Sequence, residues 1–234
     1  MSIRHLLSAV LLLCAAPAFA QVDANTARNN VIIKFSPLAL FDGDNTVQFG
    51  VEVPIRNTRF SLQEDLGYGT SDFSIWYSGS VDRPSKSTFK SRTQLRYNYY
   101  GGAHFKAYVA GEFMYKRVLY RENEWVGMDC VYGDCGYFQN MPVRIERTVS
   151  AYHPRLGWQF YFSSRLTLDL FLGVGLRHVR VTRPGLPDGR YAFSSIDELW
   201  PTTPRNETIA SAVLGFNFGL ILGKIKNTTS PSSF

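Results

Sequence analysis

The sequence is poor in cysteine and, after its first 20 residues, has no long apolar run. Only 3 of its 234 residues are cysteine, which excludes a fold built on a dense set of disulfides. No later segment has about 18 consecutive apolar residues, so the rest of the chain contains no candidate transmembrane helix. Phosphate-binding glycine loops, zinc-ligand spacings, internal repeats and nucleic-acid modules are also lacking. We therefore expect no cofactor, no metal site and no nucleic-acid partner.

The N-terminal residues are typical of an export signal. Arg4 precedes an apolar run over residues 6–16, and residues 18–20 form a small-x-small cleavage site. We interpret residues 1–20 as a secretory signal peptide, because the apolar run is too short for a transmembrane helix. Two cysteines remain after cleavage, Cys130 and Cys135. In the oxidising compartment that export implies, we expect them to form a disulfide.

Residues 165–180 have the most regular pattern in the chain, with apolar and polar side chains alternating one by one. A period of two indicates a β-strand with two chemically different faces. Seven other segments alternate in the same way, at residues 31–40, 46–55, 59–69, 91–100, 104–120, 146–162 and 207–223. One face is apolar, and in the last two strands it carries Leu166, Leu168, Leu170, Leu172, Leu214, Phe216, Phe218 and Leu220.

The other face of the predicted strands is polar and carries many charges. A soluble lipocalin-like barrel needs an apolar interior, whereas a membrane barrel turns its apolar face to lipid and its polar face to the lumen. We therefore predict an all-β fold, an eight-stranded antiparallel up-and-down transmembrane β-barrel with the apolar face towards lipid. The lumen is expected to hold Lys34, Glu52, Asp65, Arg92, Arg96, Lys106, Glu112, Lys116, Arg155, Asp169 and Arg177.

Charges inside a narrow barrel must pair, and eight strands enclose a space that side chains fill. We therefore expect a packed network of ion pairs in place of a pore. The bases in the predicted lumen outnumber the acids, which leaves two alternatives open: a site for an anion, or compensation by loop carboxylates or water. Glu64 departs from the pattern because it falls on the apolar face of its strand.

The connections between the predicted strands are sorted by length. Tight turns lie at residues 56–58, 101–103 and 163–164, and longer segments lie at 70–90, 121–145 and 182–206 together with a short turn at 42–45. Short periplasmic turns and long extracellular loops are the layout of outer-membrane barrels. The segment at 121–145 is rich in aromatic residues around its cysteines, which fits either a partner-binding loop or an extended hairpin.

The export signal, the amphipathic strands, the charged lumen and the sorted loops resemble those of the small outer-membrane β-barrels. That group includes the OmpX type, the OmpA membrane domain and related barrel domains of unknown function. The resemblance is architectural and covers residues 31–224, preceded by a short segment at 21–30 and followed by a tail at 225–234. It implies a monomer in the bacterial outer membrane, surrounded by lipid and lipopolysaccharide, and it transfers no functional residues.

We expect a structural or surface-interaction role, in envelope integrity, adhesion or partner binding, without catalysis. A surface partner would bind the loops at 121–145 and 182–206. A first alternative is a lipid A-modifying hydrolase or acyltransferase, which needs a serine, a histidine and an acid in mutual reach. His153 is the inward-facing candidate, with Ser150 three residues before it, but the spacing reveals no triad. A second alternative is a narrow channel or small-ligand carrier.

Overall fold

The computed structural model describes residues 30–71, 85–102, 104–131, 134–163, 165–184 and 205–223. Eight strands and one short 3-10 helix lie within them. These are β1 (Val31–Phe35), η2 (Pro37–Leu40), β2 (Val47–Pro54), β3 (Phe60–Thr70), β4 (Ser85–Gly101), β5 (Phe105–Met128), β6 (Tyr137–Tyr161), β7 (Leu166–Thr182) and β8 (Arg205–Leu222). The predicted signal peptide, the C-terminal tail, most of the N-terminal segment and most of the predicted loop at 182–206 lie outside the described residues.

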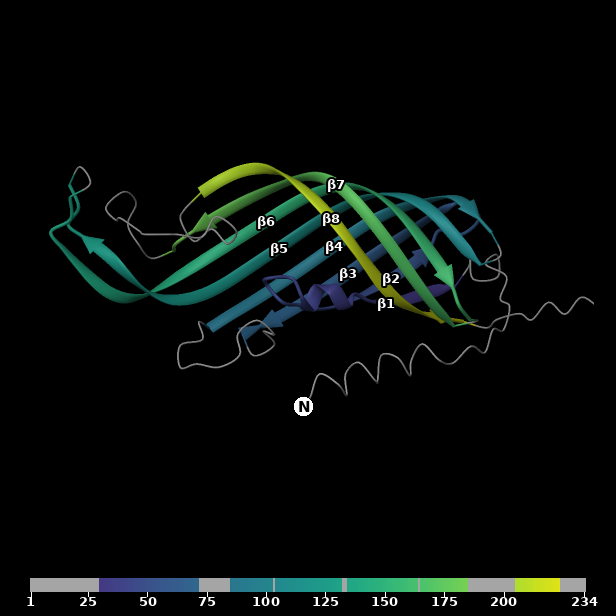
Figure 1. Cartoon of the computed structure of the whole chain (residues 1–234), viewed down its shortest axis with the longest axis horizontal. Helices are drawn as coiled ribbons and strands as arrows, with labels where there is room; N and C mark the ends of the chain where they lie inside the picture. Colours follow the sequence, from purple (N-terminus) through teal and green to yellow (C-terminus); the bar gives the residue numbers. More distant parts are fainter. Residues whose placement is uncertain are drawn as a thin grey trace, which may run out of the picture.

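Each strand is antiparallel to the next one in the chain, and β8 also pairs with β1. The strands therefore close into one up-and-down ring, which confirms the predicted all-β class (Figure 1). When the paired residues are followed once around the ring from Leu166 on β7, the path returns to β7 at Leu176, ten residues further along. With about 3.4 Å per residue and about 4.8 Å between strands, this shift corresponds to a strand tilt of about 41°, which is usual for barrels.

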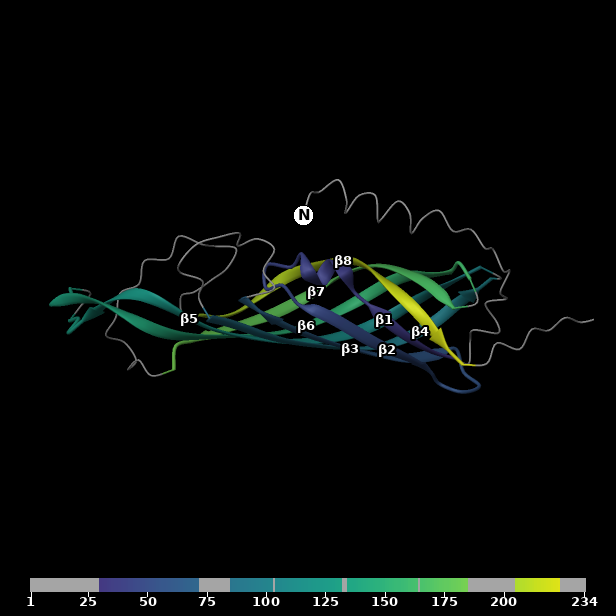
Figure 2. The ribbon, with the colours of Figure 1, turned by 90° about the horizontal axis from the view of Figure 1, so that it is seen from below.

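The connections differ in length between the two ends of the ring. The β2–β3, β4–β5 and β6–β7 connections have three to five residues, and the other four have eight to 22. We call these the short-turn end and the long-connection end. At the long-connection end β5 and β6 extend far beyond the other strands (Figures 1 and 2). The observed lengths agree with the alternation predicted from the sequence.

The first strand is shorter than predicted. The alternation predicts a strand over residues 31–40, but β1 ends at Phe35 and η2 follows. Proline explains the break, because Pro37 has no N–H to continue the ladder. The amide of Ser36 makes the last backbone hydrogen bond before η2, to the carbonyl oxygen of Gln48 at 3.1 Å.

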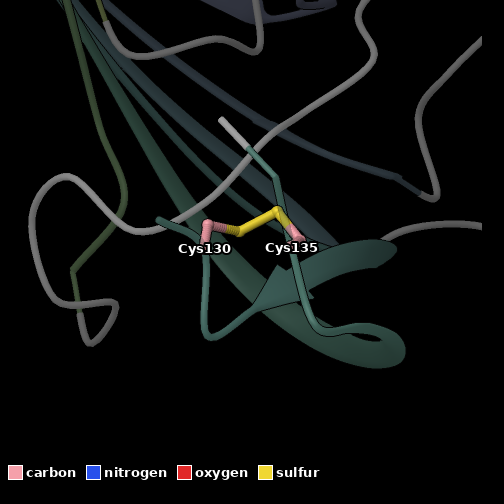
Figure 3. Close-up of a disulfide and its surroundings, with 2 residues drawn as sticks. All are labelled: Cys130 and Cys135. Carbon is pink, nitrogen blue, oxygen red and sulfur yellow. A yellow bond between two sulfur atoms is a disulfide. The ribbon is translucent and has the colours of Figure 1, made fainter. Parts of the chain in front are cut away.

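Most of residues 121–145, which the sequence analysis predicted to be a loop, form strand in the structure. β5 and β6 pair without interruption from Arg121 opposite Arg144 to Met128 opposite Tyr137, so the extended-hairpin alternative is confirmed. The remaining connection holds the expected disulfide between Cys130 and Cys135 (Figure 3). Gly127 lies close against it, since a Cβ at Gly127 would be only 2.6 Å from the Cys135 sulfur.

The inner face of the ring is mostly polar and the outer face mostly apolar. Among the described residues, 26 polar or charged residues are buried, compared with 16 hydrophobic ones. Large apolar side chains lie exposed on the outside, as for Leu214 at 79% and Tyr152 at 66% exposure. A water-soluble protein buries its apolar residues and leaves its charges in water. The arrangement is therefore inverted relative to that of a soluble barrel.

The inner face changes character towards the long-connection end. A buried apolar cluster forms there from the inward positions of β5, β6 and β7, namely Val126, Val143, Ile145, Val149, Val179 and Val181. The predicted charged lumen therefore describes the half of the interior nearer the short turns. The alternation in the sequence did not reveal this change of the inner face. Near the long-connection end, the inward and the outward positions of the strands are both partly apolar.

Gly157 on β6 provides a test of how tightly the interior is packed. A Cβ at Gly157 would lie 2.2 Å from Cζ of Tyr108, a fully buried ring. We expect Gly157→Ala to lower the free energy of unfolding by about 1–3 kcal/mol, as overpacking does. Guanidinium unfolding in detergent measures this. Gly111→Ala is the matched control, because no atom lies within 4 Å of its added Cβ; an equal loss in both variants would contradict the packing described here.

Candidate functional site

The interior near the short-turn end is held by four charged side chains from different strands. The Lys34 ammonium lies 2.6 Å from Glu52 and 2.8 Å from Asp169. The Arg96 guanidinium bridges the same two carboxylates, at 2.9 Å from Asp169 and 3.4 Å from Glu52. The Tyr108 hydroxyl donates to Asp169 at 2.8 Å. Two cations thus face two anions, so the group carries no net charge.

This end of the interior is also filled. The cavity between Asn30, Glu52, Phe60 and Lys106 has a volume of about 10 Å³. That volume accommodates at most one water molecule.

The connection between β1 and β2, residues 36–46, folds into the ring and crosses it. Asp44 is buried and binds three cations on the far wall: Lys86 at 2.9 Å, Lys116 at 2.7 Å and Arg147. Asp42 lies 3.3 Å from Lys90. Asp42 and Asp44 belong to a loop. At this level of the interior, loop carboxylates therefore compensate the excess of basic residues, which was one of the two alternatives left open by the sequence.

The cations around the crossing connection keep both of its aspartates ionised. Burial by itself would raise the pKa of Asp42, but attraction to Lys116 and Lys90 outweighs burial and lowers the pKa to about 2. Burial acts in the same direction on Asp44, and Lys116 and Arg147 lower its pKa well below the ordinary value. The connection is therefore fixed by charge at every physiological pH.

Most residues predicted to line a charged lumen are buried within the ring. These are Lys34, Glu52, Asp65, Arg92, Arg96, Lys106, Glu112, Lys116, Arg155 and Asp169. Arg177 is not, and its prediction as a buried lumen charge is wrong. It occupies an inward position on β7 near the long-connection end, where the inner face is open to solvent. Asp42 and Asp44 were missed because a loop that folds inward has no periodicity, and Arg147 was missed although it occupies an inward position of β6.

His153 lies inside the ring beside a serine and a carboxylate. Its Nε2 is 3.1 Å from the Ser211 hydroxyl on β8, and its Nδ1 is 3.4 Å from the nearer Glu112 oxygen on β5. Arg155 donates to the same Glu112 oxygen. Ser150, the serine noted in the sequence, lies three residues before His153 on β6. Its side chain therefore points to the opposite face of the strand, outward. Ser211 and Glu112 could not be matched to His153 without the register of β5 to β8.

The outer face carries the carboxylate of Glu64, as the sequence indicated. Its two oxygens accept hydrogen bonds from the hydroxyls of Ser91 at 2.7 Å and Thr93 on the neighbouring strand β4. The carboxylate therefore has local partners on an otherwise apolar surface.

A cavity of about 440 Å³ lies at the long-connection end, between β3, β4, β5 and β6. We call it the arginine pocket; its lining includes Ser85, Lys86, Ser87, Tyr120, Arg121 and Arg144. Arg121 and Arg144 are direct cross-strand partners, and like charges in this position repel. Among the described side chains, no salt bridge compensates either arginine. The pocket is therefore suited to an anion.

Comparison of the sequence with known protein families finds no matching family, and comparison with curated proteins finds no match either. Within the described ranges, no helix is long and apolar enough to cross a membrane. In the same residues, no group of three or more His, Cys, Asp and Glu side chains is placed to hold a metal ion.

The pKa values of Asp42 and Asp44 predict when the crossing connection detaches. Both folded pKa values lie below the ordinary 3.8, so the carboxylates stabilise the fold above about pH 4 and this stabilisation is lost as the pH falls towards 2. The amide of Thr46, which donates to Ala39 at 2.9 Å, should stay protected from hydrogen exchange at pH 4 and lose protection near pH 2. The short-turn amide of Ile55 is the control; loss of Thr46 protection already at pH 4 would contradict this account.

Proposed function

We propose that this chain is an integral outer-membrane β-barrel protein. The observation that supports the proposal best is the inverted distribution of side chains in a closed ring, with charges inside and large apolar residues outside. An outer surface of this kind drives association in water. In a bilayer, acyl chains solvate it, and a closed ring leaves no sheet edge without hydrogen bonds over the part where all strands pair.

The filled interior favours a structural and surface-interaction role over conduction. The short-turn end holds a cavity of about 10 Å³, and the connection at 36–46 crosses the ring above it. At the other end the β5–β6 hairpin presents exposed aromatic residues, Trp125, Tyr137 and Phe138, near its disulfide. A paired and cross-linked hairpin loses little conformational entropy when a partner binds. We place this hairpin on the cell surface.

The arginine pocket supports lipopolysaccharide as the neighbouring lipid. Arg121 and Arg144 point outward at the long-connection end, above the apolar belt of the ring. The phosphate groups of lipopolysaccharide lie at this level of an outer membrane if the long connections are extracellular. Arginine binds phosphate through charge-assisted, bidentate hydrogen bonds.

Cell fractionation tests the membrane location. We expect the protein in the outer-membrane fraction, with a gel mobility that changes on boiling because the closed ring resists detergent unless heated. Orientation follows from single cysteines: Asn140→Cys on the hairpin should react with an impermeant maleimide on whole cells, and Arg165→Cys at the short-turn end should not. A soluble periplasmic protein without a heat shift would overturn the proposal, and labelling of residue 165 alone would reverse the orientation.

The arginine pocket gives a separate prediction. Replacing Arg121 and Arg144 together by serine should weaken lipopolysaccharide binding about 30-fold, at about 1 kcal/mol for each basic residue near an anionic lipid surface. Titration of the detergent-solubilised protein with lipopolysaccharide measures the change. The control exchanges Arg56 and Arg165 for serine at the short-turn end, where binding should stay as in the wild type. Equal binding by both double variants would exclude the pocket as the phosphate site.

A further inference from the structure

The side chains of Ser211, His153 and Glu112 come from three different strands and meet on the inner face. Ser211 is on β8 and His153 is on β6, so β7 separates their backbones. Gly175 on β7 pairs directly with Ser211. A Cβ at Gly175 would lie 2.9 Å from Cδ2 of His153. The missing side chain therefore lets the imidazole cross β7 and reach the Ser211 hydroxyl at 3.1 Å.

The third member, Glu112, is held in place on the other side of the imidazole. Arg155 donates to one Glu112 oxygen, and Nδ1 of His153 lies 3.4 Å from the same oxygen. Nδ1 of His153 and the second Glu112 oxygen are both buried without a hydrogen-bond partner. To accept the Ser211 proton at Nε2, the neutral imidazole must carry its hydrogen on Nδ1, which faces this carboxylate, so Glu112 stabilises the imidazolium that proton transfer forms. Such distances shorten when substrate binds.

The inner face around Ser211 is accessible, unlike that near the short turns. Ser211 and its inward neighbours Ile209 and Val213 are partly exposed, and Arg177 beside them is exposed. β1 ends at Phe35, which pairs with Phe218, so residues 205–217 of β8 have no β1 partner. We call the strip between these residues and the connection at 36–46 the seam.

The seam places backbone N–H groups next to the serine. The amide of Ile221 donates to Arg165 beside β7, and amides alternate in direction along a strand. The amides of Ala210 and Ala212 therefore point away from β7, into the seam. No backbone hydrogen bond among the described residues joins them to the connection at 36–46. Amides two residues apart on a strand lie about 6.8 Å apart, so one of these two N–H groups can donate to an oxyanion formed beside the nucleophile.

The surroundings of Ser211 define a substrate class. Ile209 and Val213, the inward neighbours of Ser211 on β8, are apolar and partly exposed, which suits an acyl chain. Arg177 forms no salt bridge with the described side chains, and its guanidinium is available to a negatively charged head group. An anionic lipid ester carries both features.

We propose that Ser211, His153 and Glu112 hydrolyse carboxylic esters of anionic, acyl-bearing lipids that enter through the seam. The Ser211 oxygen attacks the ester carbonyl carbon while His153 Nε2 takes its proton. The oxyanion accepts a hydrogen bond from one of the two amides, that of Ala210 or that of Ala212, and the leaving alcohol receives the proton from His153. Water, deprotonated by His153, then cleaves the acyl-serine, which releases the fatty acid and restores the serine. The choice of a lipid rests on the proposed membrane location, whereas the triad itself does not.

The test is covalent labelling of the purified, detergent-folded protein with a fluorophosphonate, followed by mass spectrometry. We expect one adduct, on Ser211, in the wild type and none in Ser211→Ala. His153→Asn should slow labelling at least about 100-fold, the loss expected for a general base. Hydrolysis of p-nitrophenyl octanoate should follow the same order.

Ser61→Ala is the matched control. Ser61 is buried on the inner face of β3 and donates to Glu52 at 2.9 Å, without a histidine partner and away from the seam. This variant should label and hydrolyse as the wild type does. Each variant is compared only if it keeps the heat-dependent gel shift of the folded ring.

The outcomes separate the enzyme from the membrane location. A folded wild type that takes no adduct on Ser211, or takes it equally fast without His153, overturns the catalytic site. Labelling that depends on His153 in a protein that fractionates as soluble leaves the site standing and overturns the lipid substrate together with the proposed function. Faster hydrolysis of phosphatidylglycerol than of phosphatidylcholine in mixed micelles supports the role of Arg177, and equal rates contradict it.

Discussion

Charge pairing across the interior is the constraint on which the rest of the structure depends. A charged residue on the inner face of a narrow closed ring has little water around it and must be compensated by residues from other strands. Lys34 and Arg96 share the carboxylates of Glu52 and Asp169, which come from two further strands. Only a closed ring with one register brings these four strands together. The register brings the partners of these ion pairs together, and the ion pairs in turn stabilise this register.

The same constraint explains the connection that crosses the ring. Lys86, Lys116 and Arg147 line the wall above the first group of charges without enough carboxylates on the strands themselves. Asp44 supplies the missing charge because Pro37 ends β1 early and the chain turns inward. The short β1 has a second consequence, since it leaves residues 205–217 of β8 without a partner on that side. Pro37 is thus one cause of two features of the structure: the inward position of Asp44, and the seam beside β8.

The inner glycines of β7 show how local composition and long-range chemistry are connected. Gly173 and Gly175 leave space that side chains of β6 occupy: Arg155 lies against the first and His153 against the second. Without this space, Arg155 could not reach Glu112 in its present conformation and His153 could not reach Ser211. Glycine on the inner face is therefore a packing requirement of the site, in addition to relieving crowding in a narrow ring.

The sequence by itself determined the strands, their inward and outward faces and the sorting of connections by length. These follow from a period of two and from turn residues, which are local properties of the chain. It also determined which charges on those strands turn inward, including Arg177, which differs from the others in being exposed at the open end. The pairing of the charges, the inward fold of residues 36–46 and the meeting of Ser211, His153 and Glu112 were decided only by the tertiary structure. Their physical reason is the tilt of the strands, which shifts the register by ten residues around the ring and brings residues far apart in sequence to one height.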